Sequence, residues 1–200
     1  MIVIESQYFP SLEYFSLIKN ESEILIDGHE HFVKQTYRNR CYILTSNKIL
    51  PLSVPLNGVN KKTQTRLIKI DSSVDWRKDH WRAITSAYNR SPFFEYYDRC
   101  IYDIIYGNHT LLIDLNNEIL SFCLKVLQLD VKIAYSEKYV EITDIGFQDY
   151  RSVIHPKIEH LNRKIHTPKE YTQVFGNNFA SNLSILDLIF CCGSDSINYI

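Results

Sequence analysis

The spacing of apolar residues changes part-way along the chain, and this change constrains the fold more than any other feature of the sequence. Before Asp75, apolar residues gather in short β-branched runs, such as 1–5 and 23–27. Beyond it they recur three or four positions apart. Short runs are typical of strands and the longer period of helices, so the sequence predicts an α/β fold. The clearest helical segment contains Leu111, Leu115, Ile119, Phe122 and Val126, which are spaced four, four, three and four residues apart.

The order of these segments predicts a single compact domain over residues 1–200, with a mixed sheet and flanking helices. A short strand, a turn containing Pro10 and a helix open the chain in a Rossmann-like arrangement. A polar stretch, 149–167, is expected to be rich in loops. The other expected elements are strands at 23–27, 41–45, 49–54, 65–70, 131–135 and 139–142, and helices that begin near Asp75, Phe94, Leu111 and Ser184.

Composition excludes several classes of protein. The chain has 200 residues, with 22 Lys and Arg against 23 Asp and Glu, for a net charge of −1. This balance disfavours electrostatic binding of nucleic acid or anionic lipid, so we expect neither a nucleic-acid partner nor membrane insertion. The longest apolar stretch, 185–192, is interrupted by Asp187 and is too short to span a bilayer. The oligomeric state is left open.

The five cysteines form no C-x-x-C pair and three lie in apolar runs, which indicates free thiols in a reducing compartment. The N-terminal segment lacks the basic region of a signal peptide. The sequence therefore predicts a cytoplasmic protein.

The six glycines are too far apart for a dinucleotide fingerprint, a phosphate-binding P-loop or a G-x-S-x-G nucleophile elbow. His29 and His31 could face the same way on a strand and share a metal ion. Without a companion H-E-x-x-H or C-x-x-C motif they are more often surface residues, and no metal site is predicted.

The densest polar cluster is 34–40, which combines Lys34, Arg38 and Arg40 with amide side chains. The planar guanidinium of arginine suits carboxylate or phosphate, and a nearby lysine supplies a point charge, a base or a nucleophile. The alternative is a solvated basic edge that discourages aggregation between strands.

His80 shares a helical stripe with Trp76, Ile84 and Tyr88, so it is expected to face the interior or a cleft. In the first case a backbone carbonyl or the Tyr88 hydroxyl satisfies it; in the second it is a candidate general base.

Two further polar positions stand beside apolar segments. Ser184 and Asp187 have the spacing of a capping box, and Asp187 would need a partner such as Arg40 if it were buried. Gln7 and Tyr8 end the first strand, where polar residues of a parallel sheet line the ligand crevice.

Short motifs spread in order over nearly the whole chain are shared with a known family. They are Gln7-Tyr8-Phe9-Pro10 with Tyr14-Phe15, Lys34-Gln35-Thr36-Tyr37 with Asn39-Arg40, Val54-Pro55, Trp76 with His80, Ala87-Tyr88 with Pro92-Phe93-Phe94, Leu115-Asn116, Tyr171 with Gln173-Val174-Phe175, and residues 182–188. On these motifs the chain resembles the WbqC-like family. One departure is Glu13, where members of the family often have glycine.

The resemblance implies an association with gene clusters for O-antigen and other surface polysaccharides. It also implies a proposed role as a glycine or aminoacyl transferase acting on an amino sugar, without assigning catalytic residues. The leading hypothesis is therefore a transferase that joins an activated acyl donor, with ATP as a possible cofactor, to the amine of a nucleotide-linked sugar.

Such a reaction needs a base, donors for the developing oxyanion and cations for the diphosphate. We assign His80 as the base, Asn39 or Gln7 as the polarising donor, and Lys34 with Arg40 as the diphosphate clamp. Catalysis is thus predicted for His80, Lys34 and Asn39. The predicted substrate-binding residues are Gln7, Tyr8, Tyr37, Arg40, Tyr88 and Asp187.

Two other functions remain open. One is a non-catalytic sugar-nucleotide binding or scaffolding subunit. The other is nucleotidyl or phosphoryl transfer, which would require Mg²⁺ held by carboxylates such as Asp27 and Asp187. The transferase hypothesis also expects Gln7, Lys34, Asn39, Arg40, His80 and Asp187 to surround one pocket.

Overall fold

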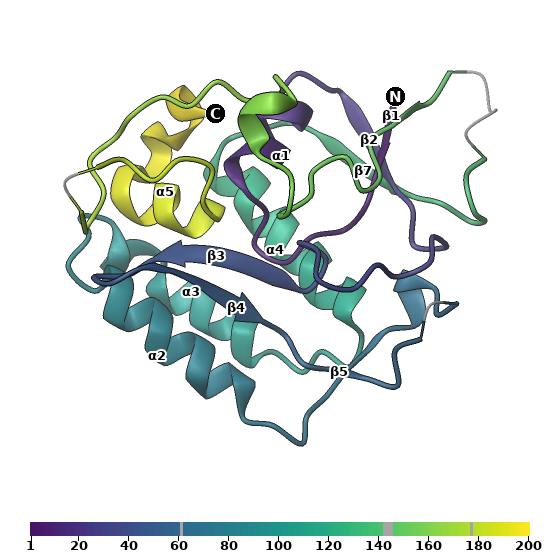
Figure 1. Ribbon diagram of the computed structural model, residues 1–200, viewed down its shortest axis with the longest axis horizontal. Helices are drawn as coiled ribbons and strands as arrows, with labels where there is room; N and C mark the ends of the chain where they lie inside the picture. Colours follow the sequence, from purple (N-terminus) through teal and green to yellow (C-terminus); the bar gives the residue numbers. More distant parts are fainter. Residues whose placement is uncertain (61, 142–145, 177) are drawn as a thin grey trace.

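A four-stranded parallel sheet forms the upper part of the molecule in the view of Figure 1. The computed structural model describes residues 1–60, 62–141, 146–176 and 178–200. The strands lie in the order β7-β2-β1-β8, and every neighbouring pair is parallel. Their bounds are β1 Ile2–Ile4, β2 Glu23–Ile26, β7 Lys132–Tyr135 and β8 Gln148–Asp149.

Two smaller antiparallel pairs lie outside this sheet. The hairpin β3 Arg40–Leu44 and β4 Ile49–Ser53 crosses the middle of the molecule, and β5 Leu56–Asn57 pairs with β6 Lys69–Ile70. The predicted α/β class with flanking helices is confirmed, with parallel and antiparallel pairing in separate sheets.

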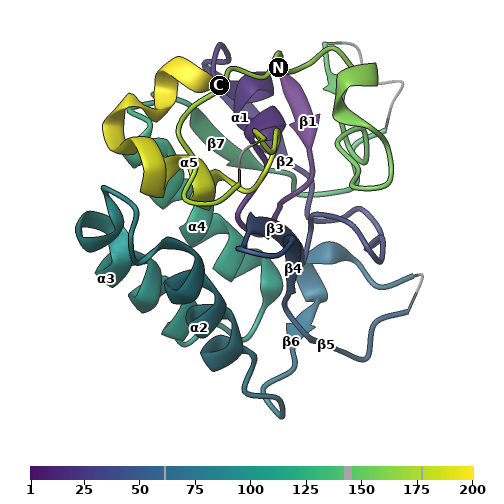
Figure 2. The same ribbon diagram turned by 60° about the vertical axis from the view of Figure 1, so that its left-hand side comes forward.

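The helices follow the apolar stripes of the sequence. Figure 2 shows α2, α3 and α4 grouped together, away from β1, whereas α1 lies close to the parallel sheet. The helices are α1 Leu12–Ile18, α2 Trp76–Tyr88, α3 Phe94–Tyr106, α4 Leu112–Val126 and α5 Ile185–Cys192, with 3₁₀ turns η1 Thr65–Leu67, η2 His160–Asn162 and η3 Gly193–Tyr199.

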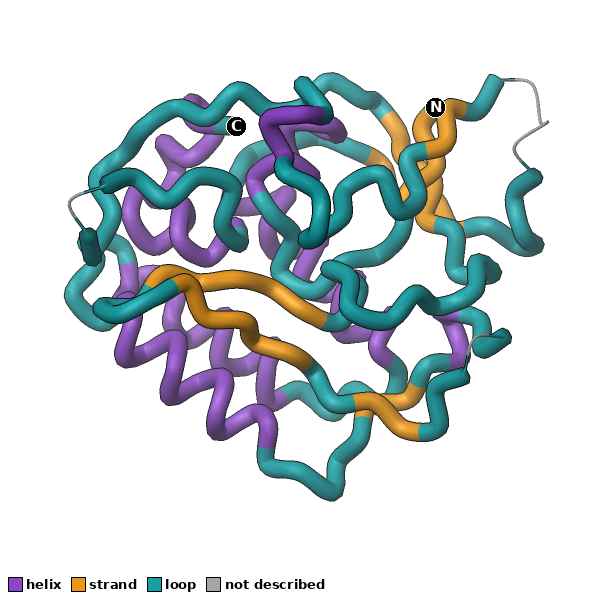
Figure 3. The backbone as a smooth tube through the Cα atoms, in the orientation of Figure 1, coloured by secondary structure: helices purple, strands orange, loops and turns teal. Residues whose placement is uncertain are grey.

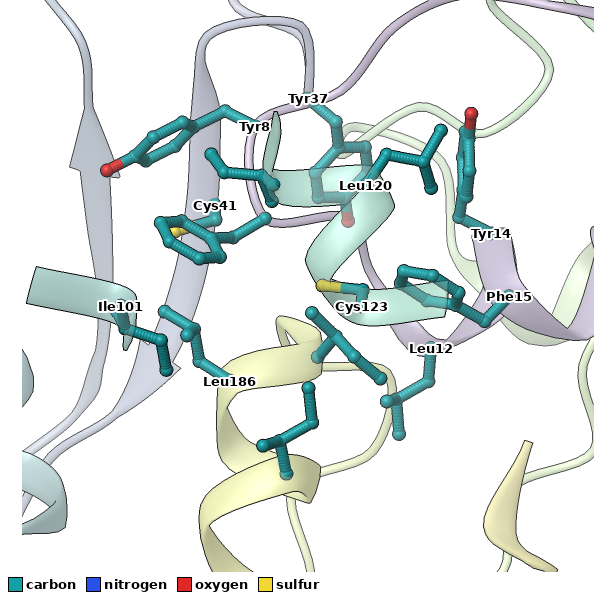
Figure 4. Close-up of a cluster of buried hydrophobic side chains, with 14 of the residues drawn as sticks. Tyr8, Leu12, Tyr14, Phe15, Tyr37, Cys41, Ile101, Leu120, Cys123 and Leu186 are labelled. Atoms are coloured by element: carbon teal, nitrogen blue, oxygen red, sulfur yellow. The ribbon is translucent and has the colours of Figure 1, made fainter. Parts of the chain in front are cut away.

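One hydrophobic cluster connects the helices with the parallel sheet. Figure 4 shows Leu12 and Phe15 of α1, Cys123 of α4 and Leu186 of α5 meeting in it. All four side chains are buried. Because α1 and α5 come from opposite ends of the sequence, this core brings distant segments of the chain together.

The segment between β8 and α5 is mostly irregular, as Figure 3 shows, which confirms the prediction of a loop-rich stretch from 149. Two strand predictions were wrong in detail. Residues 65–70 form the 3₁₀ turn η1 before the short β6, and 139–141 are irregular. Residue 142, the last of that predicted strand, lies outside the described residues.

The caps also differ from expectation. Ser184 caps α5 by accepting a hydrogen bond from the N–H of Leu186, as predicted, but Asp187 takes no part in the cap. Asp75 precedes α2 without a side-chain capping bond.

All five cysteines are free thiols, as predicted. Among the described residues, no helix has the length and apolar character needed to span a bilayer.

Candidate functional site at the carboxyl edge of the sheet

The carboxyl ends of the parallel strands meet at one edge of the sheet, where polar side chains gather. Glu5 follows β1, Asp27 follows β2, Ser136 follows β7, and Arg151 lies two residues beyond β8. The chain adds β2 and β7 on one side of β1 and then β8 on the other. Ligands of open parallel sheets bind outside the carboxyl ends at such a switch point.

A buried ion pair between Arg38 and Glu30 supports this edge. Nε and Nη2 of Arg38 donate to the two carboxylate oxygens of Glu30 at 2.7 and 2.6 Å. Nη2 also donates to Oγ of Ser152 at 3.0 Å and lies 3.9 Å from Glu5. Burial lowers the pKa of Arg38, but Glu5 and Glu30 outweigh this and raise it overall. The guanidinium therefore stays charged inside the protein.

A second ion-pair group is centred on Arg151. Its guanidinium donates to both carboxylate oxygens of Asp149, at 2.9 and 2.7 Å, and to Oδ2 of Asp27. It also lies 4.7 Å from the centre of the Tyr139 ring. Burial raises the pKa of Asp149, but the hydrogen bonds from Arg151 outweigh this and hold it below its usual value. Arg151 and Asp149 are therefore both charged at neutral pH.

Glu30, Asp149 and Arg151 of these two ion-pair groups line a cavity of about 630 Å³, which we call the edge cavity. Its volume is in the range of small-molecule sites. It is lined by His29, Glu30, His31, Gln64, Tyr139, Asp149, Arg151 and Ser152.

A second cavity, which we call the basic cavity, has a volume of about 470 Å³ and is lined by Lys34, Asn39 and Arg40 together. Nδ2 of Asn39 donates to the carbonyl oxygen of Val54 at 2.8 Å, and Nε of Arg40 donates to Oγ of Ser53 at 2.8 Å. Among the described residues, no Asp or Glu lines this cavity. Its other walls are largely apolar, with Phe32, Val54, Pro55, Leu56 and Val59.

His80 lies buried behind the wall of the basic cavity. Its Nδ1 is 2.9 Å from the Tyr8 hydroxyl, and its ring packs against Trp76 with centroids 5.0 Å apart. Burial lowers the pKa of His80 to about 4, against a smaller opposing effect of a hydrogen bond with the Ser53 backbone. The imidazole is therefore neutral at pH 7, and it contacts the basic cavity through Ser53.

Tyr88 and Asp187 form a separate hydrogen-bonded group in the core. The carboxylate of Asp187 accepts from the Tyr88 hydroxyl at 3.0 Å, the Tyr171 hydroxyl at 2.7 Å and Nε2 of Gln173 at 2.9 Å. These groups take the place of Arg40, the partner expected from the sequence. Burial raises the pKa of Asp187, although the three hydrogen bonds oppose it.

Gln7 belongs to the edge of the sheet. Its Nε2 donates to Oε1 of Glu5 at 2.8 Å, and its buried Oε1 has no hydrogen-bond partner in the described part of the chain. Tyr37 is buried at a different cavity, of about 600 Å³, which Arg163 also lines. Arg163 pairs there with Glu13, the residue that departs from the family pattern, with Nε donating at 2.7 Å.

The structure thus brings only part of the expected set together. Lys34, Asn39 and Arg40 share one cavity, and Tyr8 and His80 contact each other behind it. The six residues expected around one pocket are divided between that cavity, the sheet edge and the group at Asp187.

Sequence reasoning did not assign Glu5, Glu30, Arg38 or Arg151 to a site. Glu5 stands directly after a β-branched run, as Asp27 does, and two acidic residues at the ends of consecutive strands are a usable signal. Arg151 had no such signal, because it lies in a polar segment without periodicity.

The candidate metal ligands of the sequence form hydrogen bonds within the protein. Nδ1 of His29 is 3.3 Å from Oγ of Ser136, and Asp27 lies in a hydrogen-bond network separate from that of Asp187. Within the described ranges, no group of three or more His, Cys, Asp or Glu side chains is arranged to hold an ion.

Comparison with known families bears on the whole chain. The sequence model of the WbqC-like protein family matches residues 5–153 and 154–199. The chain belongs to the WbqC-like protein family. The chain is also similar to the uncharacterized protein Rv1507c of Mycobacterium tuberculosis (strain ATCC 25618 / H37Rv). The two are 26% identical over 223 residues, which cover 99% of this chain and 96% of that protein. No solved structure matches the chain.

Proposed function

We propose that this WbqC-like protein binds a nucleotide-linked amino sugar and transfers an acyl group to its amine in the biosynthesis of surface polysaccharide such as O-antigen. The observation that carries the proposal is the basic cavity, where Lys34, Asn39 and Arg40 meet without a neighbouring carboxylate among the described residues. A guanidinium and an ammonium group beside an apolar wall suit a diphosphate joined to a nucleoside.

Arg40 is well placed to bind phosphate. Its Nε is held by Ser53, which fixes the plane of the guanidinium, and within the described residues its two terminal nitrogens form no hydrogen bond. Lys34 is exposed and adds a second charge at the same cavity. The amide of Asn39 is anchored through Nδ2, which leaves Oδ1 as an acceptor.

The chemical step is inferred from the family resemblance and from one residue, His80. Glycine is the acyl group that family resemblance suggests, and an activated acyl donor, made with ATP or supplied by a carrier, would provide it. His80 remains the proposed base because its imidazole is neutral and it lies behind Ser53, which lines the basic cavity. To accept a proton from the amine, its Nδ1 would have to exchange the contact with the Tyr8 hydroxyl for one with the substrate. Such a reaction on nucleotide-linked precursors fits the predicted cytoplasmic location.

Binding can be tested by calorimetry with UDP, UDP-glucose and UDP-glucosamine. The double variant Lys34→Ala, Arg40→Ala should weaken binding of all three about tenfold or more, since each lost charge-assisted bond contributes about 1.5–3 kcal/mol. Lys48→Ala, in the exposed turn between β3 and β4, is the matched control and should bind normally. Retained affinity in the double variant would rule out the basic cavity.

Turnover separates a transferase from a binding or scaffolding subunit. Mass spectrometry of a mixture with the sugar nucleotide, amino acids, ATP and carrier components should show the mass of an aminoacylated product. Binding without any new product would favour the non-catalytic alternative. A Mg²⁺-dependent release of diphosphate that Asp27→Asn abolishes would instead favour nucleotidyl transfer.

A further inference from the structure

The edge cavity lies beside the basic cavity along the segment 29–40. A third cavity, of about 380 Å³ and lined by His31, Phe32, Val33, Lys34 and Asn60, shares residues with both. His31 also lines the edge cavity, and Lys34 also lines the basic cavity. A ligand whose diphosphate occupies the basic cavity therefore has the edge cavity as its neighbour.

The charged side chains of the edge cavity are already paired. Arg38 holds Glu30 through two hydrogen bonds, and Arg151 holds Asp149 in the same way. Such pairs present fixed, planar polar groups rather than mobile charges. A ligand with hydroxyl groups, which both donate and accept, matches them better than a second phosphate would.

Uncharged polar groups complete the lining. Ser152 accepts a hydrogen bond from Arg38 through Oγ, so its own hydroxyl hydrogen can be donated to a ligand. The amide of Gln64 and the hydroxyl of Tyr139, a half-exposed side chain, line the same space. This mixture of donors and acceptors suits a sugar ring.

The charges that line the cavity do not balance. Two carboxylates, of Glu30 and Asp149, stand against one lining guanidinium, that of Arg151. Deeper in the protein, Arg38 pairs with Glu30 and lies 3.9 Å from the buried Glu5, and Arg151 also pairs with the buried Asp27. Burial raises the pKa of Glu30, whereas the pKa of Asp149 stays below its usual value, so Asp149 carries the negative charge that favours a cationic ligand group.

We propose that the edge cavity binds the sugar ring and selects a sugar that carries a free, protonated amine. The inference rests on the proposed function, which places the diphosphate in the basic cavity, and concerns recognition of the sugar. The protonated amine is the form that is bound, and it would have to lose its proton and reach His80 at the basic cavity before acyl transfer. A sugar with a hydroxyl or an acetamido group at the same position lacks the positive charge and should bind more weakly.

Calorimetry with UDP-glucosamine, UDP-glucose and UDP, below the pKa of the sugar amine, tests this inference. The wild-type protein should bind UDP-glucosamine about tenfold more tightly than UDP-glucose. Asp149→Asn should remove most of this difference and leave the affinity for UDP unchanged. Asp130→Asn, an exposed residue before β7, is the matched control.

A second variant leaves the ion pairs of Arg38 and Arg151 unchanged. Gln64→Ala should weaken both sugar nucleotides several-fold but not UDP, and its melting temperature checks that the fold is kept. Equal affinities for the two sugar nucleotides would overturn the inference while leaving the basic cavity intact. Failure of all three ligands to bind would overturn the proposed function, and this inference with it.

Discussion

The hydroxyl of Tyr8, at the end of the first strand, lies 2.9 Å from Nδ1 of His80 in α2. Sequence reasoning assigned these residues to substrate binding and to catalysis, respectively. In the structure they contact each other, and the hydrogen bond between His80 and the backbone of Ser53 extends the contact to the wall of the basic cavity. The two predicted roles are therefore coupled, and variants of His80 can separate them.

For catalysis, we expect His80→Gln to abolish turnover and to leave the affinity for UDP-glucosamine within about twofold, since removing a general base costs on the order of 10²–10⁴ in rate. Kinetics and calorimetry on the same preparation measure both. A parallel loss of affinity and of melting temperature would show instead that His80 acts by holding Ser53 and Tyr8 in place.

The same variant should change how stability depends on pH. Burial lowers the pKa of His80 from 6.5 to about 4, so between these values the unfolded chain binds a proton that the folded chain does not. The stability is fully present above pH 6.5 and falls as the pH drops toward 4. His80→Gln should remove roughly 3 kcal/mol of this acid-induced loss, measured by urea unfolding at pH 7 and pH 4. Identical losses in the two proteins would contradict the assignment.

Arg38→Met should destabilise the protein by about 3–5 kcal/mol, because it leaves the buried carboxylates of Glu30 and Glu5 without their cation. Urea unfolding measures the change. The control is Arg99→Met, whose ion pair with Asp103 is exposed, and which should cost at most about 1 kcal/mol. A small effect of both variants would mean that Glu30 takes up a proton or finds another partner.

Asp187→Asn should lower stability by roughly 2–4 kcal/mol, since the amide replaces one acceptor oxygen with a donor among groups that themselves donate. Because burial raises the pKa of Asp187, the variant and the wild-type protein are compared at several pH values. The affinity of the folded variant for UDP-glucosamine should be unchanged. Weaker binding would instead support the sequence prediction that Asp187 contacts substrate.

The thiols should react in an order set by burial. Cys100 is exposed on α3, whereas Cys41, Cys123 and Cys191 are buried and burial raises their pKa. A thiol reagent should therefore modify Cys100 first in the native protein, and Cys192, whose pKa burial raises to about 11, more slowly. Mass spectrometry of the labelled peptides gives the order. Rapid labelling of Cys123 would show that α4 opens readily.

Much of the fold could be predicted because its signals are local. The period of three to four residues located α2, α3 and α4, Ser184 located the start of α5, and β-branched runs located β1 and β2. The predictions that were wrong concern segments whose structure is set by tertiary contacts. At 65–70 the N–H of Thr65 donates to the Glu30 carbonyl and the N–H of Arg66 to the Gly28 carbonyl, so the chain turns there.

The candidate site was predicted less completely, for a physical reason. Lys34, Asn39 and Arg40 are close in sequence, and their shared cavity follows from one loop and one strand. The ion pairs of the edge cavity join residues distant in sequence, such as Arg151 and Asp27, and no spacing rule identifies such pairs. Sequence reasoning likewise assigned Arg40 to Asp187, where two tyrosines and a glutamine are the actual partners.

The pairing of β8 with β1 has a consequence for synthesis of the protein. The backbone N–H of Ser152 donates to Glu5, 147 positions earlier, so the sheet edge is incomplete until the chain has been made beyond β8. A nascent chain on the ribosome carries the acidic end of β1 well before it carries Arg151. During that interval the carboxylates at this edge lack their cation, and a ligand of the edge cavity could assist folding only after the segment beyond β8 has emerged.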